Sequence, residues 1–217
     1  MNLNEYIEHT LLNPASSRDE IKRICNEAKQ FDFHAVCVHP CHVALAKKEL
    51  EGTDVKVVTV VGFPLGANKT EVKAYEAEVA IQDGADEIDM VMNIGALKEK
   101  NYEYVLKEFE ALRKSTRQKI LKVIIETDLL TKDEIIKSTE LAIQAGLDFV
   151  KTSTGFVKDG KGAQPENVRL MAEIGVPKGV RVKASGGVKT VQDAENMINA
   201  GASRIGTSHG LELVKNC

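Results

Sequence analysis

The segment Ala145-Gly146-Leu147-Asp148-Phe149-Val150-Lys151-Thr152-Ser153-Thr154-Gly155 joins the end of a helical pattern to an apolar strand that runs into a glycine turn. Glycine commonly ends a helix because it adopts the left-handed conformation that the last turn requires. The same arrangement, a helix ending in glycine with a strand soon after, recurs at Gly84 and Gly201. A repeated helix-to-strand unit predicts parallel strands joined by helices.

Short apolar runs alternate with amphipathic stretches along the whole chain, with no linker or low-complexity segment between them. We predict strands at residues 7–10, 34–38, 55–61, 87–91, 121–126, 148–152, 180–183 and 204–206. Apolar residues at three- and four-residue steps predict helices between them, among them residues 70–83, 102–117, 132–145, 165–174 and 191–200. Eight such units favour a closed barrel over an open doubly wound sheet. We therefore expect one α/β domain over residues 1–217, a (β/α)8 TIM barrel with a short helical segment before its first strand.

The composition favours a small-molecule partner. The 217 residues carry a formal net charge of -3, and their acidic and basic residues are scattered, so no basic stripe for nucleic acid is present. No run approaches the roughly 18 apolar residues of a membrane span, and residues 1–6 lack a secretion-signal pattern. We therefore expect a cytoplasmic protein with no nucleic-acid or membrane partner. The cysteines have no framework spacing and are expected to be free thiols; they are Cys25, Cys37, Cys41 and Cys217.

Two lysines, Lys151 and Lys183, occupy matching positions at the ends of apolar strands that run into glycine turns. Lysine is rarely buried without a partner or a task. At its reference pKa of about 10.4, a lysine is neutral in only about one molecule in 2,500 at pH 7. A second ammonium about 4 Å away opposes the charge of the first by on the order of 4 kcal/mol, and burial acts in the same direction. We therefore predict that Lys151 and Lys183 lie in contact and that Lys183 makes Lys151 nucleophilic.

Alternation along each barrel strand places every second side chain in the lumen. Three lumen sets are expected near the carboxyl ends of their strands, where barrel enzymes hold their chemistry. They are Phe149, Lys151 and Ser153; Arg181, Lys183 and Ser185; and Glu87, Asp89 and Val91. Asp89 is therefore a candidate acid or base. The simpler interpretation of Asp89 is a salt bridge to an internal lysine such as Lys122.

Gly155, Gly186, Gly187 and Gly206 follow late strands, where barrels often bind a phosphate on backbone amides. Ser208 is the candidate hydroxyl donor to that phosphate. Glycine after a strand is also common in simple turns. Both interpretations of these glycines therefore stay open.

The segment Cys37-Val38-His39-Pro40-Cys41-His42 crowds thiol and imidazole groups together, which are ligands that zinc prefers. Pro40 turns the chain within it, and no second cluster of such ligands completes a tetrahedral shell. We therefore expect no metal site.

Seven ordered motifs are spread nearly from one end of the chain to the other. They are His9-Thr10-Leu11-Leu12, Val60-Val61-Gly62-Phe63-Pro64-Leu65-Gly66, Ala85-Asp86-Glu87-Ile88-Asp89-Met90-Val91, Lys122-Val123-Ile124-Ile125-Glu126-Thr127, Phe149-Val150-Lys151-Thr152-Ser153-Thr154-Gly155, Val182-Lys183-Ala184-Ser185-Gly186-Gly187 and Arg204-Ile205-Gly206-Thr207-Ser208. With these motifs the chain resembles the 2-deoxyribose-5-phosphate aldolases, which are class I (Schiff-base) aldolases of the (β/α)8 type.

The resemblance implies reversible cleavage of 2-deoxy-D-ribose 5-phosphate to acetaldehyde and D-glyceraldehyde 3-phosphate, in deoxyribose phosphate catabolism and without a metal or organic cofactor. Lys151 matches the Schiff-base lysine, and Lys183 matches the second lysine, which stays protonated. Asp89 matches the acid/base that moves protons through water. The residues expected to bind substrate or its phosphate are Thr154, Gly155, Gly186, Gly187, Gly206, Ser208, Cys37 and Glu8. A homodimer is the expected assembly.

Two residues depart from the family pattern. Glu8 stands where relatives usually carry an aspartate, which is thought to contact the second lysine, and His209 stands where they commonly carry a serine. Two alternatives to the leading function therefore remain. One is another class I aldolase or transaldolase acting on a different sugar phosphate, and the other is a barrel that binds sugar phosphates without catalysis.

Overall fold

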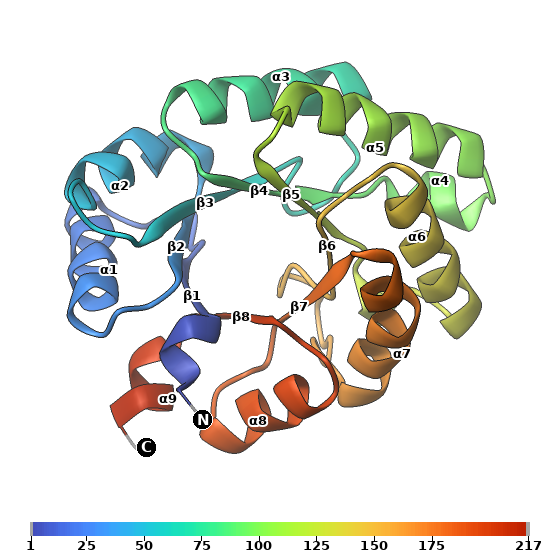
Figure 1. The fold of residues 1–217 in the computed structure, drawn as a ribbon. Helices are drawn as coiled ribbons and strands as arrows, with labels where there is room; N and C mark the ends of the chain where they lie inside the picture. The colour runs from blue at the N-terminus through green and yellow to red at the C-terminus, as the bar shows by residue number, and fades with distance from the viewer. Residues whose placement is uncertain (1, 216–217) are drawn as a thin grey trace.

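The computed structural model describes residues 2–215, which form a closed barrel of eight parallel strands (Figure 1). The strands are β1 (Ile7–Leu11), β2 (Ala35–Val38), β3 (Lys56–Val61), β4 (Glu87–Val91), β5 (Ile120–Ile124), β6 (Phe149–Lys151), β7 (Arg181–Ser185) and β8 (Arg204–Thr207). Each strand pairs with the next along the chain, and β8 pairs with β1. The predicted (β/α)8 TIM barrel is confirmed. Cys217, at the end of the domain predicted over residues 1–217, lies outside the described residues.

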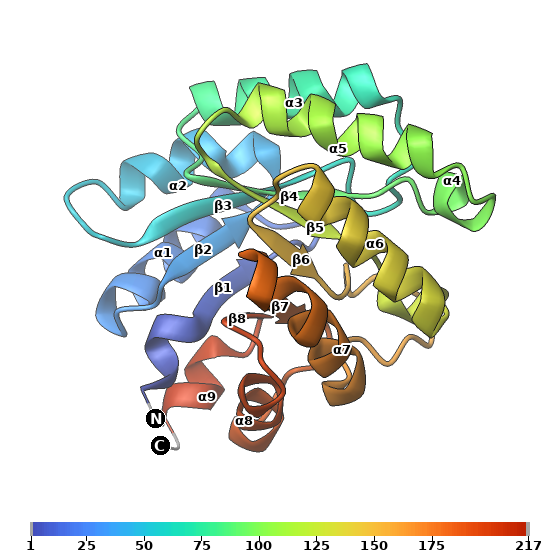
Figure 2. The same ribbon diagram turned by 45° about the vertical axis from the view of Figure 1, so that its right-hand side comes forward.

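Helices surround the barrel and cover the outer face of the strands (Figures 1 and 2). They are α1 (Arg18–Gln30), α2 (Val43–Glu49), α3 (Thr70–Gln82), α4 (Ile94–Lys98), α5 (Tyr102–Thr116), α6 (Lys132–Gln144), α7 (Pro165–Gly175), α8 (Val191–Asn199) and α9 (Gly210–Lys215). Short 3-10 segments are η1 (Leu3–Tyr6), η2 (Pro40–His42), η3 (Thr127–Leu129) and η4 (Val176–Lys178). The first of these, η1, is the helical segment predicted before the first strand. Within residues 2–215, every helix is too short or too polar to cross a bilayer.

Glycine ends the helices at the places that the sequence predicted. Gly84, Gly146 and Gly201 have φ values of 108°, 68° and 109°. Their amides donate to carbonyl oxygens in the last helical turn at 3.0, 3.1 and 2.9 Å. A side chain is disfavoured at such φ values. Glycine therefore lets the chain turn back from each helix toward the next strand.

The end of β5 differs from the prediction, which continued the strand to residue 126. The strand stops at Ile124, and Glu126 has a left-handed backbone with φ of 58°. The carboxylate of Glu126 is 2% exposed and accepts hydrogen bonds from the amide and hydroxyl of Thr154 in the loop after β6. The strand ends before the apolar pattern does, because the hydrogen bonds between Glu126 and Thr154 stabilise the left-handed backbone at Glu126.

Side chains alternate between the lumen and the helix layer along the strands. In β4, Ile88 and Met90 belong to the large apolar core under the helices, whereas Glu87 and Asp89 face the lumen and contact Lys122 of the neighbouring strand β5. A separate apolar cluster gathers on the first three strands and consists of Leu12, Ala35, Cys37, Val58 and Val60. The lumen therefore has an apolar side and a charged side.

A buried ion pair outside the lumen fixes the carboxyl end of β4. Lys73 of α3 and Glu108 of α5 are fully buried, and their charged groups lie 2.7 Å apart. The ammonium of Lys73 also donates to the carbonyl of Val91 at 2.8 Å, and Glu108 accepts from the amide of Asn93 at 2.9 Å. Burial lowers the pKa of Lys73 and raises the pKa of Glu108. Each charge is therefore tolerated mainly because the other is present.

We predict that Lys73→Met will lower the free energy of unfolding by about 3–5 kcal/mol at pH 7, because Glu108 loses its buried partner. The loss should be smaller at pH 5, because protonation of the carboxyl removes the uncompensated charge. Urea unfolding at both pH values measures this. The double variant Lys73→Met/Glu108→Gln should be more stable than the single variant at pH 7, and a double variant of equal or lower stability would contradict the explanation.

Candidate active site

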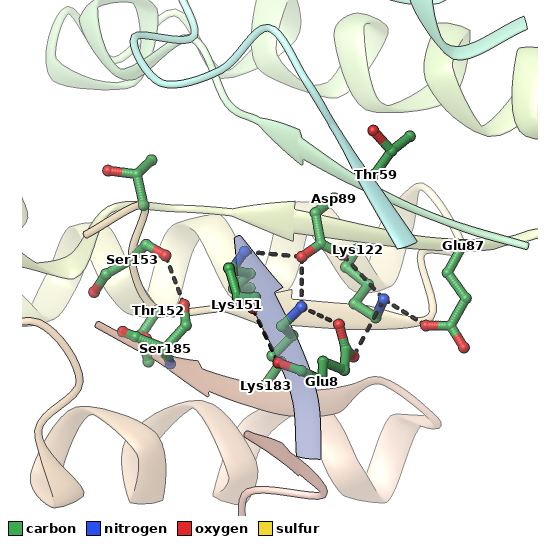
Figure 3. A network of polar contacts seen from close by, with 12 residues as sticks. Glu8, Thr59, Glu87, Asp89, Lys122, Lys151, Thr152, Ser153, Lys183 and Ser185 are labelled. Carbon is green, nitrogen blue, oxygen red and sulfur yellow. Dashed lines mark hydrogen bonds and ion pairs between the residues drawn. The ribbon is translucent and has the colours of Figure 1, made fainter. Parts of the chain in front are cut away.

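Six charged side chains meet in the barrel lumen, and Figure 3 shows how they point toward one another. We call this group the lumen cluster; it consists of Glu8, Glu87, Asp89, Lys122, Lys151 and Lys183. They come from five different strands, namely β1, β4, β5, β6 and β7. Each is at most 3% exposed. Three acids and three lysines thus compensate one another in a space that excludes bulk water.

Asp89 is the centre of the cluster. Its Oδ2 atom accepts a hydrogen bond from Lys151 at 2.8 Å and another from Lys183 at 2.6 Å. Its Oδ1 atom accepts from Lys122 at 2.9 Å. Strand register explains this convergence, because Asp89 pairs with Lys122 across β4 and β5, and Lys151 pairs with Lys183 across β6 and β7.

The predicted proximity of Lys151 and Lys183 agrees with this geometry, because both ammonium groups bond one carboxylate oxygen. The two strand ends are also tied together beyond the lysines. The Thr152 hydroxyl donates to the Ser185 carbonyl at 3.0 Å, and the Ser185 hydroxyl donates to the Ser153 carbonyl at 2.6 Å (Figure 3). Both lysines are therefore carried on strands whose ends cannot separate without breaking these bonds.

Electrostatics fixes the charge of several cluster members. Burial alone would lower the pKa of Lys183, but the carboxylates of Asp89 and Glu8 outweigh it and raise this pKa above the ordinary value. The pKa of Lys122 is raised in the same way against burial, by Asp89, Glu8 and Glu87. Burial would raise the pKa of Asp89, but Lys122, Lys151 and Lys183 hold it well below the ordinary value. At neutral pH, Lys122 and Lys183 are ammonium ions and Asp89 is a carboxylate.

Two cluster members went unassigned in the sequence interpretation. Lys122 was considered only as a salt-bridge partner of Asp89, and that salt bridge does form, together with the contacts of Asp89 to Lys151 and Lys183. Glu87 was expected in the lumen without a role, and it lies 2.5 Å from Lys122. Side-chain alternation already predicts Glu87 in the lumen, on the face of Asp89. The signal for Lys122 is strand register, because Lys122 pairs with Asp89 across β4 and β5.

Glu8 contacts the second lysine, as the family resemblance implied. Its carboxylate bonds the ammonium of Lys183 and lies 3.4 Å from that of Lys122. Glu8 is fully buried and does not line the pocket described below. The expectation that Glu8 binds substrate stays a prediction, whereas its contact with Lys183 is present, because the extra methylene keeps the charge within reach of that lysine.

A pocket of about 480 Å³ opens at the carboxyl ends of the strands, above the cluster. Of the predicted site residues, it is lined by Lys151, Thr154, Gly155, Gly186, Gly187, Gly206 and Ser208. Further lining residues that the sequence interpretation did not single out include Asn13, Phe156, Lys189 and Thr207. Lys151 therefore belongs both to the pocket and to the lumen cluster.

Backbone geometry explains the glycines of the pocket. Gly155, Gly186 and Gly187 have φ values of 81°, 83° and 77°. A Cβ on Gly206 would lie 3.0 Å from the Lys183 side chain, so glycine leaves room for that lysine to pass. These glycines shape a pocket wall of backbone, which suits an anionic group bound by amides.

Ser208 and His209 lie together at the pocket rim. The Ser208 hydroxyl and His209 Nδ1 are 3.1 Å apart, and the His209 amide donates to the Thr207 hydroxyl at 3.0 Å. Both side chains line the pocket, with Lys189 as a nearby cation of the lining. The departure from serine at position 209 therefore places an imidazole next to the candidate hydroxyl donor.

Cys37 does not line the pocket. It is fully buried in the apolar cluster on β1 to β3, and burial raises the pKa of its thiol to about 11. A thiol with such a pKa stays protonated at neutral pH. The expected substrate-lining role of Cys37 stays a prediction, since its side chain is fully buried in this structure. Nearby, His39 bonds the carbonyl oxygen of Leu12 at 2.9 Å. Across residues 2–215, no three His, Cys, Asp or Glu side chains converge in a way that could hold a metal ion.

Comparison with known proteins agrees with the geometry. Residues 5–216 match the family described as DeoC/LacD family aldolase. The chain is 55% identical to a deoxyribose-phosphate aldolase of Clostridium novyi, over 99% of this chain and 96% of that protein. It is 53% identical to a deoxyribose-phosphate aldolase of Finegoldia magna, over 99% of this chain and all of that protein.

A solved structure agrees as well. The tetrameric deoxyribose phosphate aldolase of Aeropyrum pernix is 32% identical and superimposes with a TM-score of 0.91, over 99% of this chain and 90% of that one. The match extends over nearly the full length in every case, and it includes the strands that carry the lumen cluster. The chain belongs to the DeoC/LacD family of aldolases.

Proposed function

We propose that the protein reversibly cleaves 2-deoxy-D-ribose 5-phosphate into acetaldehyde and D-glyceraldehyde 3-phosphate through a Schiff base on Lys151. The observation that carries the proposal is the position of Lys151, which lines the pocket while sharing one oxygen of Asp89 with Lys183. The deoxyribose-phosphate aldolases related to the chain support the choice of substrate.

The unprotonated Nζ of Lys151 adds to the C1 aldehyde of the open-chain sugar, and loss of water from the carbinolamine leaves an iminium between Nζ and C1. A base then takes the proton of the C3 hydroxyl, and the C2–C3 bond breaks. Its electron pair forms the C1–C2 double bond of an enamine, while C3 becomes the aldehyde of D-glyceraldehyde 3-phosphate. Protonation at C2 and hydrolysis release acetaldehyde and free the lysine.

Charge in the lumen cluster decides which lysine can act as the nucleophile. Lys183 is fully buried and bonds Glu8 as well as Asp89, so it holds its proton and does not line the pocket. Its cation faces Lys151 across the shared oxygen and disfavours a second charge there. Lys151 is thus the amine that we assign to attack, and Lys183 is the fixed cation.

Asp89 is assigned the short-lived proton transfers at carbinolamine formation and dehydration, through water. Because its pKa is held well below the ordinary value, its protonated form is a strong acid and returns the proton at once. The same low pKa keeps the carboxylate available to hold both lysines between turnovers.

The pocket rim provides the phosphate subsite in this proposal. Amides near Gly155, Gly186 and Gly187 form its backbone wall, and Ser208 adds a hydroxyl. Lys189 supplies a positive charge at the same rim. These groups favour a phosphorylated sugar over an uncharged one.

We also infer that the enzyme acts in the cytoplasm, in deoxyribose phosphate catabolism, and that copies of the chain associate. Three exposed apolar side chains support association: Leu65 is 75% exposed, and Val72 and Tyr75, three residues apart on α3, are 51% and 69% exposed. Exposed apolar side chains are enriched where a second copy binds, and Val72 and Tyr75 share one face of α3 at a three-residue step. The homodimer remains the simplest form of such an assembly.

We predict that borohydride added with 2-deoxy-D-ribose 5-phosphate will reduce an iminium and leave a covalent adduct on Lys151, located by peptide mass. Lys151→Ala should lose the adduct and at least about three orders of magnitude in kcat, because Lys151 is the pocket-lining lysine that contacts Asp89. Lys107→Ala, which removes an exposed surface lysine, is the control and should behave as wild type. Unimpaired turnover by Lys151→Ala would favour the binding-barrel alternative, and faster cleavage of another sugar phosphate would favour the other aldolase.

We predict that Lys183→Leu will abolish measurable activity at pH 7 and recover part of it as the pH rises. Removal of the neighbouring cation favours the protonated form of Lys151, so a higher pH is required to produce the free amine. The measurement is kcat/KM from pH 6 to pH 10. Lys183→Arg retains the charge and should show a profile closer to wild type, with circular dichroism as the check on folding. Equal losses at all pH values in both variants would contradict the electrostatic role.

We predict that Ser208→Ala will raise KM for 2-deoxy-D-ribose 5-phosphate about tenfold, because a hydrogen bond to a charged group contributes roughly 1.5–3 kcal/mol. The KM for unphosphorylated 2-deoxyribose should not change. Steady-state cleavage assays with both sugars measure this. A parallel loss with both sugars would show that Ser208 does not contact the phosphate.

A further inference from the structure

The lumen cluster continues beyond the reaction centre toward the opposite end of the barrel. Asp89 bonds Lys122 at 2.9 Å, Lys122 lies 2.5 Å from Glu87, and Glu87 lies 3.2 Å from Nε2 of His34. Glu87 is the first residue of β4, and His34 precedes the first residue of β2. The contacts therefore run from the carboxyl ends of the strands to their amino ends, and Figure 3 shows them as far as Glu87.

The far end of this chain of contacts is open. His34 lines a cavity of about 690 Å³ at the amino ends of the strands, together with Glu5, Lys29, Asp32, Asp54 and Arg204. The His34 side chain is 20% exposed, whereas that of Glu87 is 4% exposed. A change of charge at the far face can therefore act electrostatically on the buried cluster through His34 and Glu87.

Glu87 has no contact with the pocket, yet it is held as a carboxylate. Burial would raise its pKa, but Lys122 and His34 lower it to about 2. Lys122 is fully buried, and its ammonium charge is compensated by three carboxylates, those of Glu87, Asp89 and Glu8. Without Glu87, the cation of Lys122 would be compensated only by the two acids that also hold Lys183.

We propose that Glu87 is a positioning residue that controls, through Lys122 and Asp89, how readily Lys151 gives up its proton. Glu87 compensates part of the positive charge of Lys122 near the amino ends of the strands. That leaves the Oδ2 atom of Asp89 for Lys151 and Lys183, and it keeps the number of acids and lysines in the cluster equal. The consequence for turnover rests on the proposed function, but the effect on Lys151 does not.

The size of the effect follows from the strand geometry. Lys122 bridges Glu87 and Asp89 at 2.5 and 2.9 Å, and Asp89 bonds Lys151 at 2.8 Å, so the Glu87 carboxylate lies within roughly 10 Å of the Lys151 nitrogen. One unit of charge at that distance changes the protonation of a lysine by about one pH unit at an effective dielectric of 20. Removing the negative charge of Glu87 disfavours the protonated amine, so Lys151 becomes unprotonated at lower pH.

The charges that surround Glu87 and Lys122 must stay constant in the test; β3, which pairs with β4, faces them with apolar Val58 and Val60. These charges are Glu8 on β1, Asp89 on β4, Lys151 on β6 and Lys183 on β7. Arg181 of β7 lies 4.1 Å above the Phe149 ring, and Arg204 of β8 lines the far cavity with His34. Lys122 keeps Asp89 and Glu8 as partners in a Glu87 variant and so keeps its proton.

The test is competitive labelling with trace acetic anhydride, which acylates only unprotonated amines and releases acetate. Acetylation of Lys151, quantified by peptide mass from pH 5 to pH 10, gives the midpoint at which this amine loses its proton. We expect Glu87→Gln to lower the midpoint by about one pH unit and Glu87→Asp to restore it. The acidic limb of the kcat/KM profile should move in the same direction.

Two matched controls separate this effect from general damage. Glu103→Gln removes the same charge from an exposed pair with Lys107 on α5, and Glu108→Gln breaks a buried pair outside the lumen. Neither should move the midpoint. An unchanged midpoint in folded Glu87→Gln, or an equal shift in either control, overturns the proposal.

If Glu87→Gln does not fold, His34→Glu tests the same connection from the open end. It adds a negative charge beside Glu87, and the Lys151 midpoint should then rise by a few tenths of a pH unit, because the added charge is farther away and partly screened. A midpoint that stays fixed or falls overturns the proposal. Labelling does not require turnover, so an inactive wild type would refute the proposed function while leaving this measurement intact.

Discussion

The carboxylate of Asp89 is the interaction on which the site depends. One buried group accepts hydrogen bonds from three lysines on three strands, and each of those lysines would be unstable in the lumen without an acid. The strand register makes this convergence a consequence of the barrel itself, because Asp89 pairs with Lys122 and Lys151 pairs with Lys183. A shift of one residue in either register would turn the side chains out of the lumen.

The division of the lumen into an apolar side and a charged side follows from the same geometry. Apolar residues of β2 and β3, with Leu12 after β1, fill one side, and the lysines of β5, β6 and β7 converge on the other. The apolar side excludes water, which strengthens the interactions among the charges. Of the three lysines, Lys151 alone reaches the pocket, so the reactive amine is exposed to substrate while the compensating charges stay buried.

The fold was predictable from the sequence because its signals are local. Glycine at the helix ends and alternating apolar patterns report on each βα unit by itself, and eight units favour closure. The prediction was wrong at the end of β5, where Glu126 leaves the strand to bind Thr154. No local pattern shows that contact, because the partner lies on the loop of another strand.

For the site, the sequence by itself determined the residue types and the faces they share: Lys151, Lys183 and Asp89 at strand ends, with glycine turns after them. Only the tertiary structure decided the partners. It placed Glu8 on Lys183, brought Glu87 and Lys122 into the cluster, and kept Cys37 away from the pocket. The physical reason is that alternation fixes the direction of a side chain along its own strand, whereas the distances between charges depend on register and closure, which exist only when all eight strands are paired.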